Sequence, residues 1–270
     1  MNNPTLAFIG GGNMASALIG GLIKAGSAPK SILVIEPFAE QREKLVASFG
    51  VVAQAQADAQ LATTGLVIWA VKPQLFAQAA APCAAHVGGA LQLSVMAGIR
   101  ASAITKATGA QRIVRAMPNT PALIGRGVAG LFARPEVSAA ERAWVEQVLR
   151  PTGALVWVER EEQLDAVTAV SGSGPAYVFY LLEAMMQAAT EMGLSPEQGR
   201  ALALGTFDGA TALAAQSLLS PNALRAQVTS KGGTTHAAIT SLDGDAVMAA
   251  LVKALHAAKR RAAELGDEFG

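Results

Sequence analysis

Short apolar runs alternate with segments of helical periodicity over the first two thirds of the chain. The apolar runs predict strands at residues 6–9, 32–35, 66–71, 91–95, 113–116, 127–132 and 154–158. Helical spacing of apolar residues predicts helices at residues 13–25, 39–49, 101–107 and 138–149, and another starting near residue 74. Because fully apolar strands alternate with helices, the pattern predicts a parallel sheet covered on both faces. This is the doubly wound α/β class, with a Rossmann-type sheet.

The pattern changes near Glu161, after which helical periodicity continues with little strand signal. Ser195, Pro196 and Gln198 have the spacing of a helix start with an N-cap, a first-turn proline and a capping box. Gly193 is placed to end the preceding helix. We therefore predict a dinucleotide-binding domain over residues 1–162 and an all-helical domain over residues 163–270.

Composition narrows the possible functions. Only 15% of the 270 residues are charged, against about a quarter in a typical soluble domain. The 21 basic and 20 acidic side chains give a net charge of +1, so no basic excess points to nucleic acid or a membrane surface. One cysteine excludes an intrachain disulfide framework, and three histidines far apart in sequence argue against a metal site. We expect no bound metal.

Residues 1–23 carry no charged side chain and thereby imitate the apolar part of a signal peptide or a membrane-spanning helix. However, no Lys or Arg precedes the apolar part, and the glycines at 10–12 interrupt it. The stretch therefore predicts a short strand followed by a helix start. We expect a soluble, cytoplasmic protein.

The strongest chemical motif is the run from Gly10 to Ala15, which fits G-x-G-x-x-A between a predicted strand and a predicted helix. Gly10 allows a tight turn, Gly12 lets the backbone approach a pyrophosphate, and Ala15 lets the helix pack close to the strand. The helix N-terminus supplies free N–H groups for phosphates. The alternative is a glycine-rich turn without a ligand, but the flanking elements favour a dinucleotide.

Glu36 ends the second predicted strand, near the place for an acid that bonds the adenosine ribose. An acid there favours NAD, whereas Arg42 can pair with the 2′-phosphate of NADP. The alternative is a solvated loop residue. We therefore predict NADPH or NADH as cofactor without choosing between them.

Four further loops carry candidate ligand groups: residues 70–74, 115–121, 171–177 and 228–236. The first two follow strands, where ligands bind in open α/β sheets. The last places Gly232 and Gly233 among hydroxyl residues before a helix, an arrangement suited to a carboxylate. For each loop the alternative is structural: a solvated lysine, a local turn, a helix–helix turn or a capped helix start.

The sequence also lacks two catalytic patterns of other reductases. Tyr177 and Tyr180 have no Lys four positions on, and no His lies near the predicted strand ends in the way a carbonyl reductase needs. A hydride acceptor that needs little acid help fits this pattern. A C=N bond qualifies, because an imine is basic enough to arrive protonated.

Together the motifs resemble the pyrroline-5-carboxylate reductase family over essentially the whole chain. The most specific stretch comprises Pro221, Leu224, Val228, Thr229, Ser230, Gly232, Gly233, Thr235, Ala238, Ile239, Leu242 and Asp243. The resemblance implies hydride transfer from NADPH or NADH to 1-pyrroline-5-carboxylate, giving L-proline. It also implies interlocked helical dimers, some of them assembled as decamers of five dimers.

The resemblance implies site roles as well. Cofactor-binding residues would be Ile9, Gly10, Gly11, Gly12, Asn13, Met14, Glu36, Ala70, Val71, Lys72, Pro73, Ala97, Met117, Pro118 and Asn119. Substrate-binding residues would be Glu161, Ser230, Gly233, Thr234 and Thr235, with Thr235 as the catalytic group near the imine nitrogen. Many members have Ser, Asn or Thr followed by Arg where this chain has Glu36 and Pro37, which leaves the cofactor preference open.

Alternative functions make different demands on the sequence. A β-hydroxyacid dehydrogenase relies on a Lys in the long interdomain helix, and residues 175–192 contain none; an imine reductase of similar plan stays open. A dinucleotide-binding sensor would have no use for the loop at 232–235. The segment 175–229 is also poor in charge, and helices that are apolar on nearly all sides are stable only when they are buried. Because no uninterrupted span of membrane length exists, we expect them to form a homodimer interface.

Overall fold

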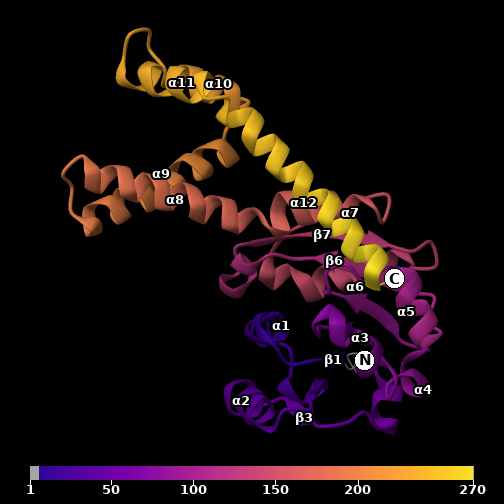
Figure 1. The fold of residues 1–270 in the computed structure, drawn as a ribbon. Helices are drawn as coiled ribbons and strands as arrows, with labels where there is room; N and C mark the ends of the chain where they lie inside the picture. The colour runs from indigo at the N-terminus through magenta and orange to yellow at the C-terminus, as the bar shows by residue number, and fades with distance from the viewer. Residues whose placement is uncertain (1–5, 270) are drawn as a thin grey trace. The chain divides into compact units, whose positions relative to one another are not determined.

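The computed structural model describes residues 6–269 (Figure 1). One sheet contains eight strands in the order β3-β2-β1-β4-β5-β6-β7-β8. The strands are β1 (Leu6–Ile9), β2 (Ile32–Ile35), β3 (Val52–Gln54), β4 (Leu66–Trp69), β5 (Leu91–Ser94), β6 (Ile113–Met117), β7 (Gly127–Ala133) and β8 (Gly153–Trp157). The first six strands in this order, β3 through β6, have the arrangement of a doubly wound dinucleotide-binding fold.

Two features of the sheet differ from the sequence prediction. Strand β3 was not predicted; it is three residues long and half-buried, so it lacks a fully apolar run. Strand β7 runs antiparallel to β6, whereas an entirely parallel sheet was expected. The connection between them, residues 118–126, is too short for the crossover that a parallel neighbour needs. Strand β8 then pairs parallel to β7.

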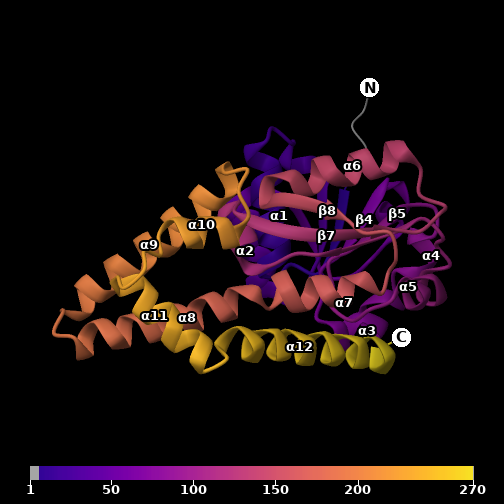
Figure 2. The same ribbon diagram turned by 90° about the horizontal axis from the view of Figure 1, so that it is seen from above.

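Helices cover both faces of this sheet (Figure 2). On one face α1 (Asn13–Lys24), α2 (Ala39–Phe49) and α6 (Ala139–Leu149) contribute to one core cluster. On the other, α3 (Phe76–Ala80), α4 (Ala84–Val87) and α5 (Ala101–Thr108) contribute to a second. Leu6 and Phe8 of β1 belong to the first cluster, and Ala7 and Ile9 to the second. Successive side chains point to opposite faces of a strand, so a strand covered on both sides is apolar throughout.

The three tryptophans are all anchored around this sheet. Trp69 is fully buried, stacks edge-to-face on Phe76 at 5.3 Å, and donates from Nε1 to Gln92 Oε1 at 2.8 Å. Trp144 and Trp157 pack against the first core cluster. The Trp157 ring lies 5.3 Å from the Arg142 guanidinium carbon, a cation–π arrangement.

The C-terminal region is helical, as predicted. Its helices are α7 (Gln163–Val167), a π-helical turn (Thr168–Gly172), α8 (Gly174–Glu191), α9 (Pro196–Gln216), α10 (Pro221–Gln227), α11 (Thr234–Gly244) and α12 (Val247–Phe269). Ser195 and Gln198 form the predicted capping box of α9. Gly193 has a φ of 93°, which the turn before α9 requires. Within residues 6–269 no helix is long and apolar enough to cross a membrane.

Contacts divide the chain into two compact units. One runs through Gly174 and includes the chain end from Ala258, and the other is Pro175–Ala257. We call them the sheet unit and the helical unit. This division differs from the predicted boundary between residues 162 and 163. Asp165 pairs with Arg100, and the last turns of α12 lie on the loop after β5, so both segments pack with the sheet.

Candidate active site

The glycine-rich turn joins β1 to α1 at the carboxyl edge of the sheet. Gly10 has a φ of 95°, and its N–H donates to the Ile35 carbonyl at 2.9 Å. A Cβ at Gly10 would lie 2.7 Å from the Ala70 carbonyl oxygen and 2.8 Å from Val71 Cγ1. Both the backbone conformation and the packing therefore require glycine at this position.

Gly12 presents the opposite case. It has an ordinary φ of −69°, and a Cβ there would meet no protein atom within 4 Å. Gly12 is also the N-cap of α1, where no side chain caps the helix and no acid lies in the first turn. Packing within the protein therefore does not require a glycine at position 12. The N-terminus of α1 instead has free N–H groups with open space beside them. This arrangement fits a pyrophosphate that approaches the backbone closely.

Glu36 is turned toward the glycine-rich turn. Its carboxylate accepts from the Gly11 N–H at 2.8 Å and from the Phe38 N–H at 3.0 Å, and the residue is only 7% exposed. The predicted alternative of a solvated loop acid is therefore wrong. A carboxylate offers about four lone-pair sites, so these two bonds leave acceptor capacity for a ribose hydroxyl.

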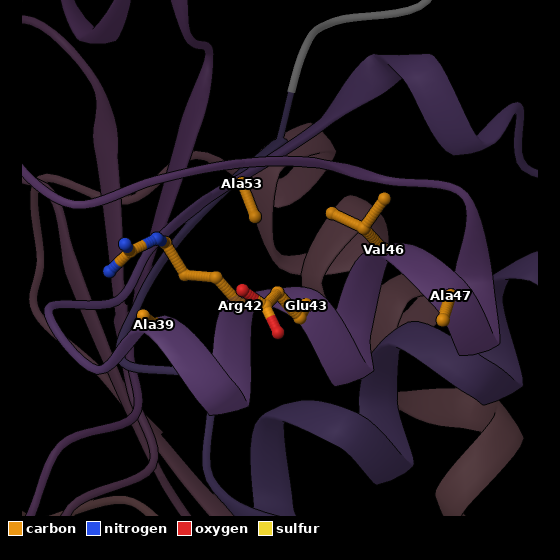
Figure 3. A pocket seen from close by; sticks show the side chains of 6 residues that line it. All are labelled: Ala39, Arg42, Glu43, Val46, Ala47 and Ala53. Carbon is orange, nitrogen blue, oxygen red and sulfur yellow. The ribbon is translucent and has the colours of Figure 1, made fainter.

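Arg42 of α2 lies next to the carboxyl end of β2. Its Nη1 atom donates to the carbonyl oxygens of Glu36 and Pro37, at 2.8 and 2.7 Å. The side chain also lines an open pocket of 460 Å³ between α2 and Ala53 of β3 (Figure 3). The other lining residues are Ala39, Glu43, Val46 and Ala47. The Arg42 guanidinium therefore lies next to Glu36, at the strand end where an acidic or a basic side chain separates NAD from NADP in this fold.

The segment after β4 closes over the glycine-rich turn. The strand ends at Trp69, earlier than predicted, and the Ala70 N–H donates to the Ile9 carbonyl at 2.8 Å. Lys72 is exposed at the start of a short 3-10 turn, Pro73–Leu75. The predicted residues 70–73 thus line the edge of the sheet next to Gly10.

Two of the predicted loops come together at the end of β6. The Asn119 amide donates from Nδ2 to the Ser171 carbonyl at 3.1 Å, and its Oδ1 accepts from the Val128 N–H at 3.0 Å. A Cβ on Gly172 would lie 2.6 Å from Met117 Cε. The Asn119 side chain therefore links backbone segments at both of its ends. Ser171 and Gly172 lie in the π-helical turn, a feature common at functional sites.

Glu161 is part of a charged cluster that sequence reasoning did not find. Its Oε1 atom accepts from the Ala101 N–H at 2.7 Å and from Arg115 Nη1 at 2.8 Å. Burial lowers the pKa of Arg115, while the charge of Glu161 acts to raise it. A second pair joins Arg100 to Asp165 at 3.2 Å. The two pairs span 46 and 65 positions, and no sequence pattern reports contacts over such separations.

The loop before α11 belongs to the helical unit. Gly232 has a φ of 76°, and Gly233 is the N-cap of α11, so the helix that the sequence predicts to start near Thr235 begins at Thr234. The Gly233 N–H donates to the Ser230 carbonyl at 3.0 Å. Thr234 is exposed and Thr235 half-buried, and no side chain caps the helix at Gly233. Such a loop combines free N–H groups with hydroxyl donors, the chemistry that binds a carboxylate.

Comparison with known proteins decides the family. Residues 161–265 match the family described as "Pyrroline-5-carboxylate reductase dimerisation", and residues 5–98 match "NADP oxidoreductase coenzyme F420-dependent". The chain is 44% identical to a pyrroline-5-carboxylate reductase of Pseudomonas aeruginosa, with 100% of both chains covered. The chain belongs to the pyrroline-5-carboxylate reductase family. The family predicted from the motifs is confirmed.

Solved structures of the pyrroline-5-carboxylate reductase family agree with this fold. A member from Coxiella burnetii is 36% identical with a TM-score of 0.91, and 98% of this chain and 99% of that chain are covered. A Plasmodium falciparum member with NADP bound is 25% identical with a TM-score of 0.87, over 98% and 99% of the two chains. The predicted class, a Rossmann-type sheet followed by a helical dimerisation domain, is confirmed.

No cluster of three or more His, Cys, Asp or Glu side chains in residues 6–269 could hold a metal ion. The one cysteine, Cys83, is buried, and burial raises its pKa to about 11. At neutral pH it is therefore a thiol, which is a poor nucleophile and a poor metal ligand.

Proposed function

We propose that this chain reduces 1-pyrroline-5-carboxylate to L-proline by hydride transfer from NADPH or NADH. The observation that carries the proposal is the 44% identity to a pyrroline-5-carboxylate reductase over the full length of both chains. The NADP oxidoreductase match over residues 5–98 supports the cofactor class, as does NADP in the Plasmodium falciparum relative. The open space at Gly12 supports a dinucleotide on independent, physical grounds.

The cofactor would lie along the carboxyl edge of the sheet. The Gly10 and Gly11 N–H groups are already bonded within the protein, so these residues would shape the turn. The N–H groups at residues 12–14 would bind the pyrophosphate, and Glu36 would face the adenosine ribose. Residues 70–73, Ala97 and the loop 117–119 would line the remainder. When bound, NAD(P)H supplies the hydride; the protein supplies orientation and the exclusion of water.

The substrate is a cyclic imine with a carboxylate, and the loop before α11 suits both groups. The Gly233 N–H is bonded to the Ser230 carbonyl, so Gly233 would contribute the backbone turn. The N–H groups of Thr234 and Thr235 at the start of α11, with the Ser230 hydroxyl, would bind the carboxylate. The Thr235 hydroxyl would lie near the imine nitrogen and hold its proton as the ring nitrogen becomes an amine. Since the protonated imine is already electrophilic, a weak donor that is well placed is sufficient.

The proposal includes an assembly. The match of residues 161–265 to a dimerisation family supports a homo-oligomer. We propose a homodimer built through the helical unit, with a decamer of five dimers as a higher assembly, in the cytoplasm. The apolar side chains exposed on α8 and α9 of the single chain support the dimer.

The direct test is turnover. Purified protein should oxidise NADPH or NADH when 1-pyrroline-5-carboxylate is added, and no turnover with either cofactor would overturn the proposal. Thr235→Ala should lower kcat at least tenfold, about 1.4 kcal/mol of lost transition-state stabilisation. Thr240→Ala is the matched control, because Thr240 lies on α11 with its hydroxyl bonded to the His236 carbonyl. Wild-type rates for Thr235→Ala would leave Thr235 only a structural role at the helix start.

A further inference from the structure

Two shielded ion pairs fix the segment after β8 to the carboxyl edge of the sheet. Glu161 pairs with Arg115 of β6, and Asp165 pairs with Arg100 just before α5. The side chain of Arg115 is 5% exposed and that of Asp165 is 9% exposed. Salt screens such pairs little, and removal of one partner leaves an uncompensated charge. The pairs therefore constrain geometry in a way that exposed pairs do not.

The loop between β5 and α5, residues 95–100, is held from two directions. Glu161 accepts the Ala101 N–H at the end of the loop, and Asp165 binds the Arg100 guanidinium. From the other direction, α12 packs so closely that a Cβ on Gly266 would lie 2.5 Å from Arg100 Nη2. Ala97 therefore lies in a loop whose end is fixed by both contacts.

The loop after β6 is held by the same segment. Ser171 accepts from the Asn119 amide, and Gly172 leaves the space that the Met117 side chain fills. The Arg115–Glu161 pair joins this strand to the start of α5. Residues 161–173 thus connect the loop after β5 to the loop after β6.

The fold decides which half of a dinucleotide these loops face. A dinucleotide lies across the carboxyl edge where the strand order reverses, here between β1 and β4. Glu36, at the end of β2, marks the adenosine half. The nicotinamide half therefore falls over β4, β5 and β6, and the last two strands are followed by the two loops that residues 161–173 connect.

We propose that residues 161–173 position the nicotinamide half of the cofactor, with Glu161 and Gly172 as the positioning residues. The inference rests on the proposed function. Glu161 acts through its contacts with Arg115 and Ala101, and it does not touch the substrate directly. Loss of the Glu161 charge releases the end of the loop that carries Ala97, and the adenosine half keeps its own contacts.

The test compares whole cofactors with fragments that lack nicotinamide. Binding of NADPH and of 2′-phospho-ADP-ribose, and of NADH and ADP-ribose, is measured by calorimetry on the full-length oligomer. Glu161→Gln should weaken binding of the whole cofactor at least fivefold and change binding of the fragment less than twofold. NAD(P)H fluorescence in the complex should also shift, because it reports the surroundings of the nicotinamide ring.

The matched control is Glu141→Gln. Glu141 also caps a helix start, that of α6, and pairs with an arginine beside β6, Arg112, but at the amino end of the strand. This variant should leave both affinities unchanged. Equal loss of cofactor and fragment in Glu161→Gln would show general damage to the sheet and overturn the inference. A raised KM for pyrroline-5-carboxylate with unchanged cofactor binding would instead make Glu161 a substrate ligand.

Gly172→Ala provides a second route if Glu161→Gln does not fold. The added methyl group would lie 2.6 Å from Met117 Cε, the flexible end of a side chain that can move at small cost, and its other neighbours, the nearest being Thr168 Cγ2 at 3.7 Å, are at ordinary contact distance. It should produce the same selective loss of whole-cofactor affinity, and unchanged affinity would overturn the inference. Cofactor binding and fluorescence decide the inference and need no turnover, so failure of turnover in the wild-type protein would remove the proposed reaction and leave these readouts intact.

Discussion

The sheet unit and the helical unit use apolar residues in opposite ways. In the sheet unit, β1, β2, β4 and β5 are buried at every position and two core clusters fill the space on either side. In the helical unit, which is described in full, only Ala189, Gly199 and Ala203 are buried. Large apolar side chains on α8 and α9 are exposed, among them Phe179, Tyr180, Leu202 and Leu213.

The difference shows which part can form its core from one chain. The sheet unit buries its apolar surface internally, so its fold is specified by its own sequence. The helical unit buries few of its side chains and leaves large apolar ones exposed along α8 and α9, and contiguous exposed apolar surface marks an interaction site. Obligate dimer interfaces resemble a core cut in half, so the missing half is expected from a second copy.

The largest effect should come from charge placed on the helical unit. The double variant Phe179→Glu with Leu202→Glu should abolish the dimer and with it turnover, since each buried carboxylate costs several kcal/mol. Light scattering measures the mass. Gln216→Glu, at the exposed end of α9, is the control and should stay oligomeric. A double variant that still dimerises would place the interface elsewhere.

A second comparison lies within the glycine-rich turn. Gly10→Ala should destabilise the sheet unit by about 1–3 kcal/mol, because its positive φ and the Ala70 carbonyl both exclude a side chain. Gly12→Ala should change the free energy of unfolding by less than about 1 kcal/mol. It should nevertheless raise the Kd for NAD(P)H at least tenfold, about 1.4 kcal/mol.

Denaturant unfolding and cofactor titration of both glycine variants separate these effects. Normal cofactor affinity in Gly12→Ala would mean that the phosphates do not approach this position. Normal stability in Gly10→Ala would mean that the turn can relax around the methyl group.

The smallest effect concerns cofactor choice. Glu36→Gln removes the charge that would face a 2′-phosphate and keeps one oxygen for the Gly11 or Phe38 N–H. The ratio of kcat/KM with NADPH to that with NADH should rise about threefold to tenfold, or about 0.7–1.4 kcal/mol. Glu40→Gln, on the exposed first turn of α2, should leave the ratio unchanged. An unchanged ratio in Glu36→Gln would limit that carboxylate to holding the turn.

The sequence predicted those elements whose identity depends on local pattern. The strands at 6–9 and 32–35 begin and end where predicted, because each is a fully apolar run bounded by turn residues. The helix start at Ser195 was also predicted correctly, since a capping box is a local signal. Strand β3 was missed because it is a strand only through its pairing with β2.

The candidate site divides in the same way. The sequence predicts a tight turn at Gly10 between a strand and a helix, and the positive φ of Gly10 in the structure is what such a turn requires. The inward turn of Glu36 depends on the position of the Gly11 N–H, and the partner of Glu161 depends on the sheet register. These contacts join residues 25 and 46 positions apart, so they exist only in the folded chain.

The tryptophans and the tyrosines lie in different units, so two spectroscopic signals can follow the unfolding of the two units separately. All three tryptophans (Trp69, Trp144 and Trp157) belong to the sheet unit, and both tyrosines (Tyr177 and Tyr180) belong to the helical unit. Tryptophan emission, excited beyond the tyrosine absorption band, therefore reports the sheet unit alone, and the tyrosine band of the second-derivative absorbance spectrum reports α8. If the oligomer dissociates before the sheet melts, the tyrosine signal changes first on heating, and an unmodified protein records the order of the two events.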